Sequence, residues 1–122
     1  MKTHCVSALI VSQPGPLRDG LRALLTAMPR VKIIGEVNDT ASVLRRIQRH
    51  RPTLVLMDAD LLGDEARNTL KAIKTNWPQV RCIVLTSTVE QQQAAALAGA
   101  DSAPLKGLLA EKLYATIEKL LS

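Results

Sequence analysis

The sequence predicts an α/β protein with a five-stranded parallel sheet, doubly wound so that helices cover both faces. First, strand-like and helix-like segments alternate five times within 122 residues, joined by connections of only a few residues. Such alternation is typical of right-handed β-α-β crossovers and a parallel sheet. Second, the strand-like segments are continuous apolar runs. The clearest run, Leu54 to Met57, lies between Pro52 and Asp58, which indicates a strand buried on both faces.

The other elements follow from the same patterns. Apolar residues at helical spacing, together with cap residues and prolines, set the helix limits. Residues 38–40 (Asn-Asp-Thr) supply N-cap candidates and Gly99 is a candidate C-cap, while residues 59–64 form a polar loop. The expected strands are 6–11, 31–37, 54–57, 81–86 and a short one at 102–105. The expected helices are 17–28, 40–51, 65–76, 89–98 and 109–121.

Composition indicates a single domain, residues 1–122, with an aliphatic core. Apolar residues make up 47% of the chain, yet Trp77 and Tyr114 are the only aromatic ones. The sequence has no apolar run as long as a membrane span and no apolar signal-peptide core near Met1, so we expect a cytoplasmic protein without membrane contact. Cys5 and Cys82 are far apart and suit neither a disulfide framework nor a zinc site, and we expect both to be buried.

The net charge of +5 is unevenly distributed, because residues 45–51 hold five basic side chains and no acid. Such a cluster is either a nucleic-acid contact or a solvated helix face. Since no aromatic residue is interleaved for base stacking, the solvated face is the better interpretation. The cluster consists of Arg45, Arg46, Arg49, His50 and Arg51.

Polar residues follow four of the expected strands, at ends that share one edge of a parallel sheet. Ligands of open α/β sheets bind at this edge. A carboxylate nucleophile together with a hydroxyl and an ammonium group, which stabilise phosphoryl oxygens, would form a phosphoryl-transfer site. The residues delivered to the edge are Ser12, Gln13, Asp58, Asp60, Thr86, Ser87 and Lys106.

Six motifs in this order resemble the receiver domains of bacterial two-component response regulators, most closely the subfamily with a LuxR-type helix-turn-helix output domain. They are LIV (9–11), LRDGLRALL (17–25), VLMD (55–58), Trp-Pro (77–78), IVLTS (83–87) and GAD…LK (99–106). The resemblance covers essentially the whole chain and implies a flavodoxin-like receiver fold with strand order 2-1-3-4-5. It also implies that a histidine kinase phosphorylates Asp58 with Mg²⁺ assistance, with Thr86 as the phosphate-sensing hydroxyl and Lys106 as the conserved-type lysine.

The sequence departs from the family at the metal site. Family members carry two acidic residues directly after the first strand, whereas this chain has Ser12 and Gln13. Only Asp58 and, weakly, Asp60 could then offer carboxylate ligands to Mg²⁺, a cation that binds through oxygen. Loss of a Lewis acid worth several kcal/mol would slow transfer by orders of magnitude. We therefore expect weak or absent Mg²⁺-dependent phosphorylation at Asp58.

Two further departures lie on the fifth expected strand and just after it. Ala103 stands where many family members have a tyrosine or phenylalanine that turns inward on activation, and alanine has no rotamer to switch. Gly107 follows Lys106 where proline with a cis peptide bond is common, and a cis bond before glycine is improbable.

Two functions remain open at this point. The chain is a receiver that accepts phosphate at Asp58, or it is a phosphorylation-independent module for protein interaction and dimerisation that regulates a DNA-binding output domain. The second function needs an outer helix face that suits a partner, and the first and last helices are the candidates. The alternative is that the leucines of these helices all point into the sheet. The leucines concerned are Leu17, Leu24, Leu113 and Leu120.

Both functions describe a signalling protein and not a metabolic enzyme. The expected partners are a histidine kinase or another signalling protein, with a homodimer as one alternative, and DNA only through an output domain outside this sequence. A flavodoxin-like small-molecule binder is less favoured, because the loop Gln13 to Pro16 lacks the backbone donors that a nucleotide phosphate requires.

Overall fold

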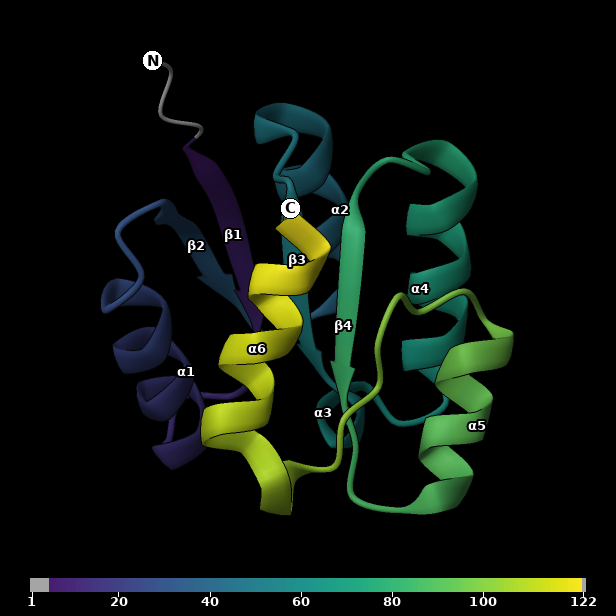
Figure 1. The fold of residues 1–122 in the computed structure, drawn as a ribbon. Helices are drawn as coiled ribbons and strands as arrows, with labels where there is room; N and C mark the ends of the chain where they lie inside the picture. Colours follow the sequence, from purple (N-terminus) through teal and green to yellow (C-terminus); the bar gives the residue numbers. More distant parts are fainter. Residues whose placement is uncertain (1–4, 122) are drawn as a thin grey trace.

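The computed structural model describes residues 5–121 and contains a parallel sheet with helices on both faces (Figure 1). The strands are β1 (Val6–Val11), β2 (Val31–Val37), β3 (Leu54–Asp58) and β4 (Arg81–Leu85), in the order β2-β1-β3-β4. Every neighbouring pair is parallel. The carboxyl ends of β1, β3 and β4 therefore meet at one edge, as the alternating sequence pattern predicts.

The helices lie close to their expected positions. An additional short helix, α3, replaces part of the loop expected at residues 59–64, because the Asp58 side chain accepts a hydrogen bond from the Asp60 N–H and caps it. A cap within residues 38–40 is confirmed: Asp39 accepts from the Ser42 N–H. Gly99 follows α5 with a φ of 107°, as expected for the end of that helix. The helices are α1 (Pro16–Thr26), α2 (Thr40–His50), α3 (Ala59–Leu62), α4 (Glu65–Asn76), α5 (Val89–Leu97), the 3₁₀ helix η1 (Lys106–Leu108) and α6 (Leu109–Leu121).

The predicted fifth strand is wrong: the sheet in the described residues has four strands. Residues 102–105 do run parallel to β4, but they form only two isolated bridges, Ile83 with Ser102 and Thr86 with Leu105. The N–H of Thr86 donates to the carbonyl of Pro104, yet Pro104 has no N–H to continue the ladder. The segment therefore lies along the sheet edge without becoming a regular strand.

The core forms two layers, one on each face of the sheet, because alternate strand residues point to opposite faces. Helices α1 and α6 cover one face, and α2, α4 and α5 cover the other. The four leucines considered for an outer interaction face all pack against the core layer under α1 and α6, one of them fully buried and three partly buried, so they do not form an exposed apolar face. They are Leu17, Leu24, Leu113 and Leu120.

One arginine of the basic cluster is structural. The pairing of β1 with β2 shifts by one residue at Ile34, and the guanidinium of Arg46 donates to the Ile34 carbonyl at 2.9 Å. The approach is so close that a Cβ on Gly35 would lie 2.6 Å from an Arg46 nitrogen. Arg46 thus satisfies a carbonyl next to the bulge, which leaves fewer residues in the cluster for any other purpose.

The expectation that both cysteines are buried is half wrong. Cys82 is fully buried in β4, and burial raises the pKa of its thiol to about 12. Cys5, just before β1, is exposed. Its position ahead of the first strand places it outside the core layers that bury the neighbouring apolar residues.

Candidate functional site

Asp58 ends β3 and begins α3, so its carboxylate lies at the edge of the sheet. Its Oδ1 accepts the backbone N–H of Asp60 at 2.9 Å and forms an ion pair with Nζ of Lys106 at 2.7 Å. Only 13% of the side chain is exposed. Among the described residues Oδ2 accepts no hydrogen bond, and this oxygen is therefore the one free to act as a nucleophile.

Lys106 lies between two carboxylates. Its Nζ is 2.7 Å from Oδ1 of Asp58 and 2.8 Å from Oδ2 of Asp60. Burial alone would lower the pKa of Lys106, but hydrogen bonds to Asp58 and Asp60 outweigh burial and raise that pKa. The ammonium group therefore stays charged at neutral pH, and the structure brings three of the predicted site residues into direct contact.

Asp60 accepts hydrogen bonds from side chains on three other parts of the chain. Lys106 and the hydroxyl of Ser87 donate to Oδ2, and the amide of Gln91 donates to Oδ1 at 2.8 Å. These contacts, with Lys106 as the largest cause, followed by Ser87 and Gln91, hold the pKa of Asp60 well below its usual range. Asp60 thus links the end of β3 to the start of α5 and to the segment after residue 105.

The network continues into the first turn of α5. The Thr88 hydroxyl accepts the Gln91 N–H at 3.1 Å, and Oε1 of Gln91 accepts the Ser87 N–H at 2.6 Å. This is a variant of the capping box, in which a residue three positions into the helix bonds back toward the N-cap. Gln91 was not among the residues predicted from the sequence, although the pattern Thr88-x-x-Gln91 is its local signal.

Thr86 is close in the backbone, but its hydroxyl has another partner. The Lys106 N–H donates to the Thr86 carbonyl at 2.9 Å, and the Thr86 hydroxyl donates to the carbonyl of Pro104 at 3.0 Å. The residue is completely buried. Ser87, and not Thr86, provides the hydroxyl that contacts a carboxylate of this site, that of Asp60.

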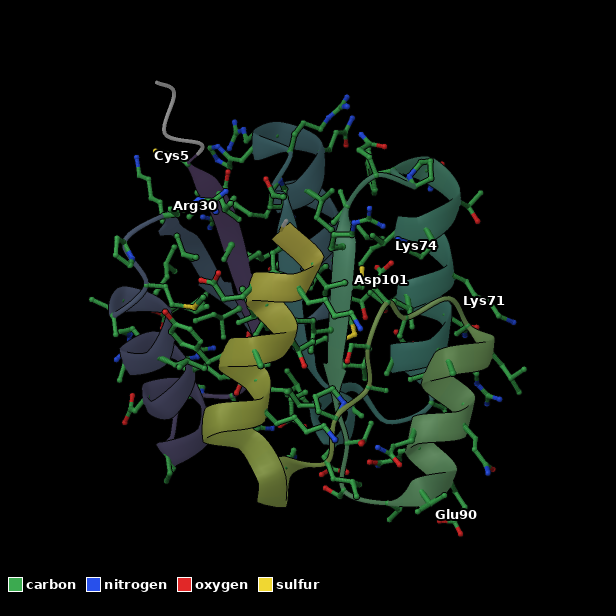
Figure 2. The ribbon with its side chains drawn as sticks, in the orientation of Figure 1. Cys5, Arg30, Lys71, Lys74, Glu90 and Asp101 are labelled. Atoms are coloured by element: carbon green, nitrogen blue, oxygen red, sulfur yellow. The ribbon has the colours of Figure 1, made fainter. Side chains whose placement is uncertain are left out.

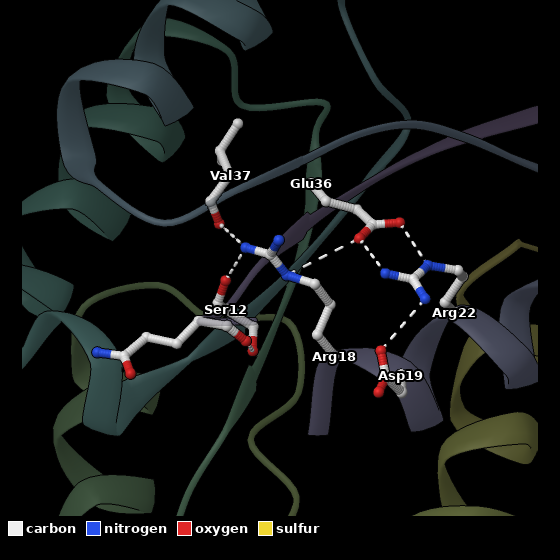
Figure 3. Close-up of polar contacts among 7 residues, drawn as sticks. Ser12, Arg18, Asp19, Arg22, Glu36 and Val37 are labelled. Atoms are coloured by element: carbon white, nitrogen blue, oxygen red, sulfur yellow. Dashed lines mark hydrogen bonds and ion pairs between the residues drawn. The ribbon is translucent and has the colours of Figure 1, made fainter. Parts of the chain in front are cut away.

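Ser12 and Gln13 follow β1, which pairs with β3 on the side away from β4, and Figure 3 shows the contacts that Ser12 makes. The guanidinium of Arg18 donates to the carbonyls of Ser12 and Val37, and its Nε lies 3.8 Å from Glu36. Ser12 is buried, with its hydroxyl donating to the Gln13 carbonyl at 3.1 Å. A positive side chain, also missed by the sequence analysis, therefore holds the loop where family members carry acids.

An open pocket of about 300 Å³ lies between this loop and the start of α3, lined by residues 12–17, 58, 60 and 61. The side chains around it do not fit a Mg²⁺ site. Within residues 5–121 no three acidic, histidine or cysteine side chains gather where they could hold a metal. Asp58 and Asp60 both contact the Lys106 ammonium, so each carboxylate already has a cationic partner, and no further carboxylate among the described residues lines the pocket.

A second polar cluster lies at the opposite end of β4, where Lys74 of α4 and Asp101 turn toward one another (Figure 2). Their charged groups are 3.0 Å apart, and Asp101 also accepts the Cys82 N–H at 2.8 Å. Lys74 further donates to the Val80 carbonyl at 2.8 Å. These contacts satisfy backbone groups at the sheet edge, so the cluster has a structural role.

The fold and the carboxylate–ammonium site at its edge define a receiver-like signalling domain. Residues 8–118 match the family described as the response regulator receiver domain, and the chain belongs to this family. This confirms the resemblance inferred from the sequence motifs. In the family, response regulators interact with histidine kinases, and their output domains bind DNA. Receiver domains typically bind Mg²⁺ at the phosphorylation site and generally act in signalling.

Curated relatives include a transcriptional activator and a response regulator. The chain is 26% identical over 115 residues to the DNA-binding transcriptional activator DevR/DosR of Mycobacterium tuberculosis, covering 93% of the chain and 53% of that protein. It is 25% identical over 116 residues to the response regulator VraR of Staphylococcus aureus, covering 93% and 56%. The chain thus spans about half the length of these relatives.

Solved structures agree with the fold. A LuxR-family DNA-binding response regulator from Staphylococcus aureus superposes with a TM-score of 0.84 at 20% identity, covering 96% of this chain and 99% of that one. A LuxR-family two-component response regulator from Aurantimonas sp. SI85-9A1 gives a TM-score of 0.86 at 23% identity, covering 96% and 85%. Within residues 5–121, none of the helices has the length and apolar character needed to span a membrane.

Proposed function

We propose that residues 1–122 form a single receiver domain of a two-component response regulator, with Asp58 as the phosphoacceptor and with weak or absent Mg²⁺-dependent phosphorylation. The observation that supports this most directly is the Lys106 ammonium, 2.7 Å from Asp58 and 2.8 Å from Asp60. A nucleophilic carboxylate and a fixed cation beside it are two of the groups that phosphoryl transfer uses.

The proposed step moves one phosphoryl group from a histidine kinase to Asp58. Oδ2 of Asp58 attacks phosphorus, the P–N bond to the kinase histidine breaks, and the leaving imidazole nitrogen takes up a proton. The product is an acyl phosphate on Asp58. Lys106 would stabilise the phosphoryl oxygens, and Ser87 is better placed than Thr86 to offer a hydroxyl, because the Thr86 hydroxyl is bound to Pro104.

The expectation of slow transfer rests on charge. With Ser12 and Gln13 in place of acids, and with Lys106 bound to both remaining carboxylates, no described set of oxygen ligands is arranged for a divalent cation. The negative charge that develops at phosphorus would then be balanced by Lys106 alone. Each 1.4 kcal/mol of lost stabilisation slows the step about tenfold.

The alternative function is a phosphorylation-independent module for protein interaction and dimerisation that regulates a DNA-binding output domain. One observation favours it: the contacts of Asp60 already connect β3, α5 and Lys106 without a phosphoryl group. A site connected in this way favours one conformation. For either function we propose a cytoplasmic location, a histidine kinase or other signalling protein as partner, and DNA contact through an output domain.

The test is incubation with phosphoramidate and Mg²⁺, followed by intact-mass measurement. A single phosphate adduct that is absent from Asp58→Asn would support the receiver function, with a slow rate expected. No adduct at saturating phosphodonor would favour the phosphorylation-independent module. Repeating the reaction with EDTA measures the contribution of the metal, which we expect to be small.

A further inference from the structure

We propose that the Asp60 carboxylate is an internal competitor for the donors that a phosphoryl group on Asp58 needs, and that it clamps the start of α5 while the site is unphosphorylated. This inference rests on the proposed function, because it concerns the same donors. It assigns to Asp60 a positioning role in place of the metal-ligand role considered from the sequence.

The first argument is the number and kind of donors that one carboxylate receives. Lys106 and Ser87 donate to one oxygen of Asp60, and Gln91 donates to the other. The Asp60 side chain is 46% exposed, so water could have solvated it. Instead an ammonium, a hydroxyl and an amide converge on it from different parts of the chain, and this set of donors is suited to bind an oxyanion.

The second argument is charge balance. At rest the site holds two carboxylates and one ammonium. A phosphoryl group on Asp58 replaces one negative charge by nearly two, and the described residues add no further cation in contact with either carboxylate. Lys106 cannot neutralise both groups equally well, so phosphorylation would weaken its contact with Asp60. Asp60 therefore opposes the modification of Asp58.

Asp60 also holds the first turn of α5 in place. Gln91, one of its donors, also accepts the Ser87 N–H at 2.6 Å and belongs to the first turn of α5. Its neighbour Gln92 donates to the carbonyl of Ala103 at 2.8 Å. Displacement of Asp60 would therefore free the loop before α5, and through α5 it would reach the 102–105 segment. Coupling can then operate without the aromatic switch that Ala103 lacks.

The test compares Asp60→Asn with Asp64→Asn. Asp64 is an exposed aspartate four residues further on, and its side chain makes no capping hydrogen bond, so the control removes the same charge from the same edge of the sheet. Inorganic phosphate is titrated into each protein, and binding is followed through the backbone amide signals of residues 87–91. We expect about tenfold tighter phosphate binding by Asp60→Asn than by wild type or Asp64→Asn. Asp60→Glu, which retains the charge, should behave like wild type.

A second readout needs no ligand. Amide hydrogen exchange at Ser87 should become at least several-fold faster in Asp60→Asn and stay unchanged in Asp64→Asn. Equal phosphate affinity and equal exchange in the two asparagine variants would overturn the inference. The phosphoramidate reaction separates it from the proposed function: no adduct in wild type or in Asp60→Asn overturns the phosphoacceptor role alone, whereas a faster adduct only in Asp60→Asn supports both.

Discussion

The ion pair between Asp58 and Lys106 should contribute measurably to the free energy of unfolding. The perturbation is a double-mutant cycle with Asp58→Asn, Lys106→Met and the combined variant. Asparagine keeps an oxygen for the Asp60 N–H, so the cycle isolates the charge interaction from the capping of α3.

The expected coupling free energy follows from distance and burial. The charged atoms are 2.7 Å apart, and the side chains are 13% and 27% exposed. Hydrogen bonds between charged groups are worth about 1.5–3 kcal/mol, and exposed pairs about 0–1 kcal/mol. This pair lies between those limits, so we expect a coupling of about 1–2 kcal/mol. In a parallel cycle with Asp60→Asn and Lys106→Met, the Asp60–Lys106 pair, with Asp60 46% exposed, should couple by less than about 1 kcal/mol.

The measurement is urea unfolding followed by far-UV circular dichroism, in about 0.1 M and about 1 M salt. Salt should reduce the Asp60 coupling more than the Asp58 coupling, because screening acts mainly on exposed charges. An Asp58 coupling that is zero within error, or smaller than that of Asp60, would refute the argument from burial. Unchanged m-values are required for the comparison, since they show that the wild type and every variant unfold by the same transition.

Three further predictions concern residues away from the phosphoryl site. Arg46→Met should lower the free energy of unfolding by about 1–3 kcal/mol, because the substitution removes the donor to the Ile34 carbonyl. Chemical denaturation measures this free energy. An unchanged value would mean that water replaces the guanidinium. Native protein at pH 8 should react with iodoacetamide at Cys5 and not at Cys82, whose thiol pKa is about 12; two rapid modifications under native conditions would contradict the buried position. Glu36→Gln should lower the melting temperature at pH 7. This decrease should become smaller as the pH falls below the usual pKa of a glutamate. A hydrogen bond from Arg22 of α1 lowers the pKa of Glu36. The stabilisation by Glu36 is therefore complete above its unfolded-state pKa and is lost as the pH falls through its folded-state pKa. A difference in melting temperature that stays constant down to about pH 2 would exclude the carboxylate as the cause.

Sequence reasoning succeeds here where the controlling interaction is local. The continuous apolar runs and cap residues predict the four strands, the helices and the order of these elements along the chain, because burial and capping act within a few residues. It fails at residues 102–105 for a reason that the sequence contains. Pro104 cannot donate to the ladder, and an assignment based on apolar pattern alone overlooks this backbone requirement.

The sequence predicts which residues meet at the site but not which hydrogen-bond partners they have. Asp58, Asp60 and Lys106 meet because the topology brings strand ends together. The hydrogen-bond partners of the Asp60 and Thr86 side chains, by contrast, depend on contacts between residues distant in sequence. Asp60 and Gln91 are 31 positions apart, and no local pattern reports that their side chains touch. The direction of a hydroxyl, such as that of Thr86 toward Pro104, is likewise set by tertiary packing.

The residues at positions 12, 13 and 60 are best understood together. A receiver edge with an acidic pair next to its phosphoacceptor gathers like charges that require a cation. Here Ser12 and Gln13 remove that charge, and Lys106 binds the carboxylates of Asp58 and Asp60 directly. Lys106 thus supplies part of the positive charge that a divalent cation would otherwise supply. If Asp58 is the phosphoacceptor, as we propose, the same contacts would make Lys106 less available to a phosphoryl group, so the features that stabilise the resting site would oppose its phosphorylation.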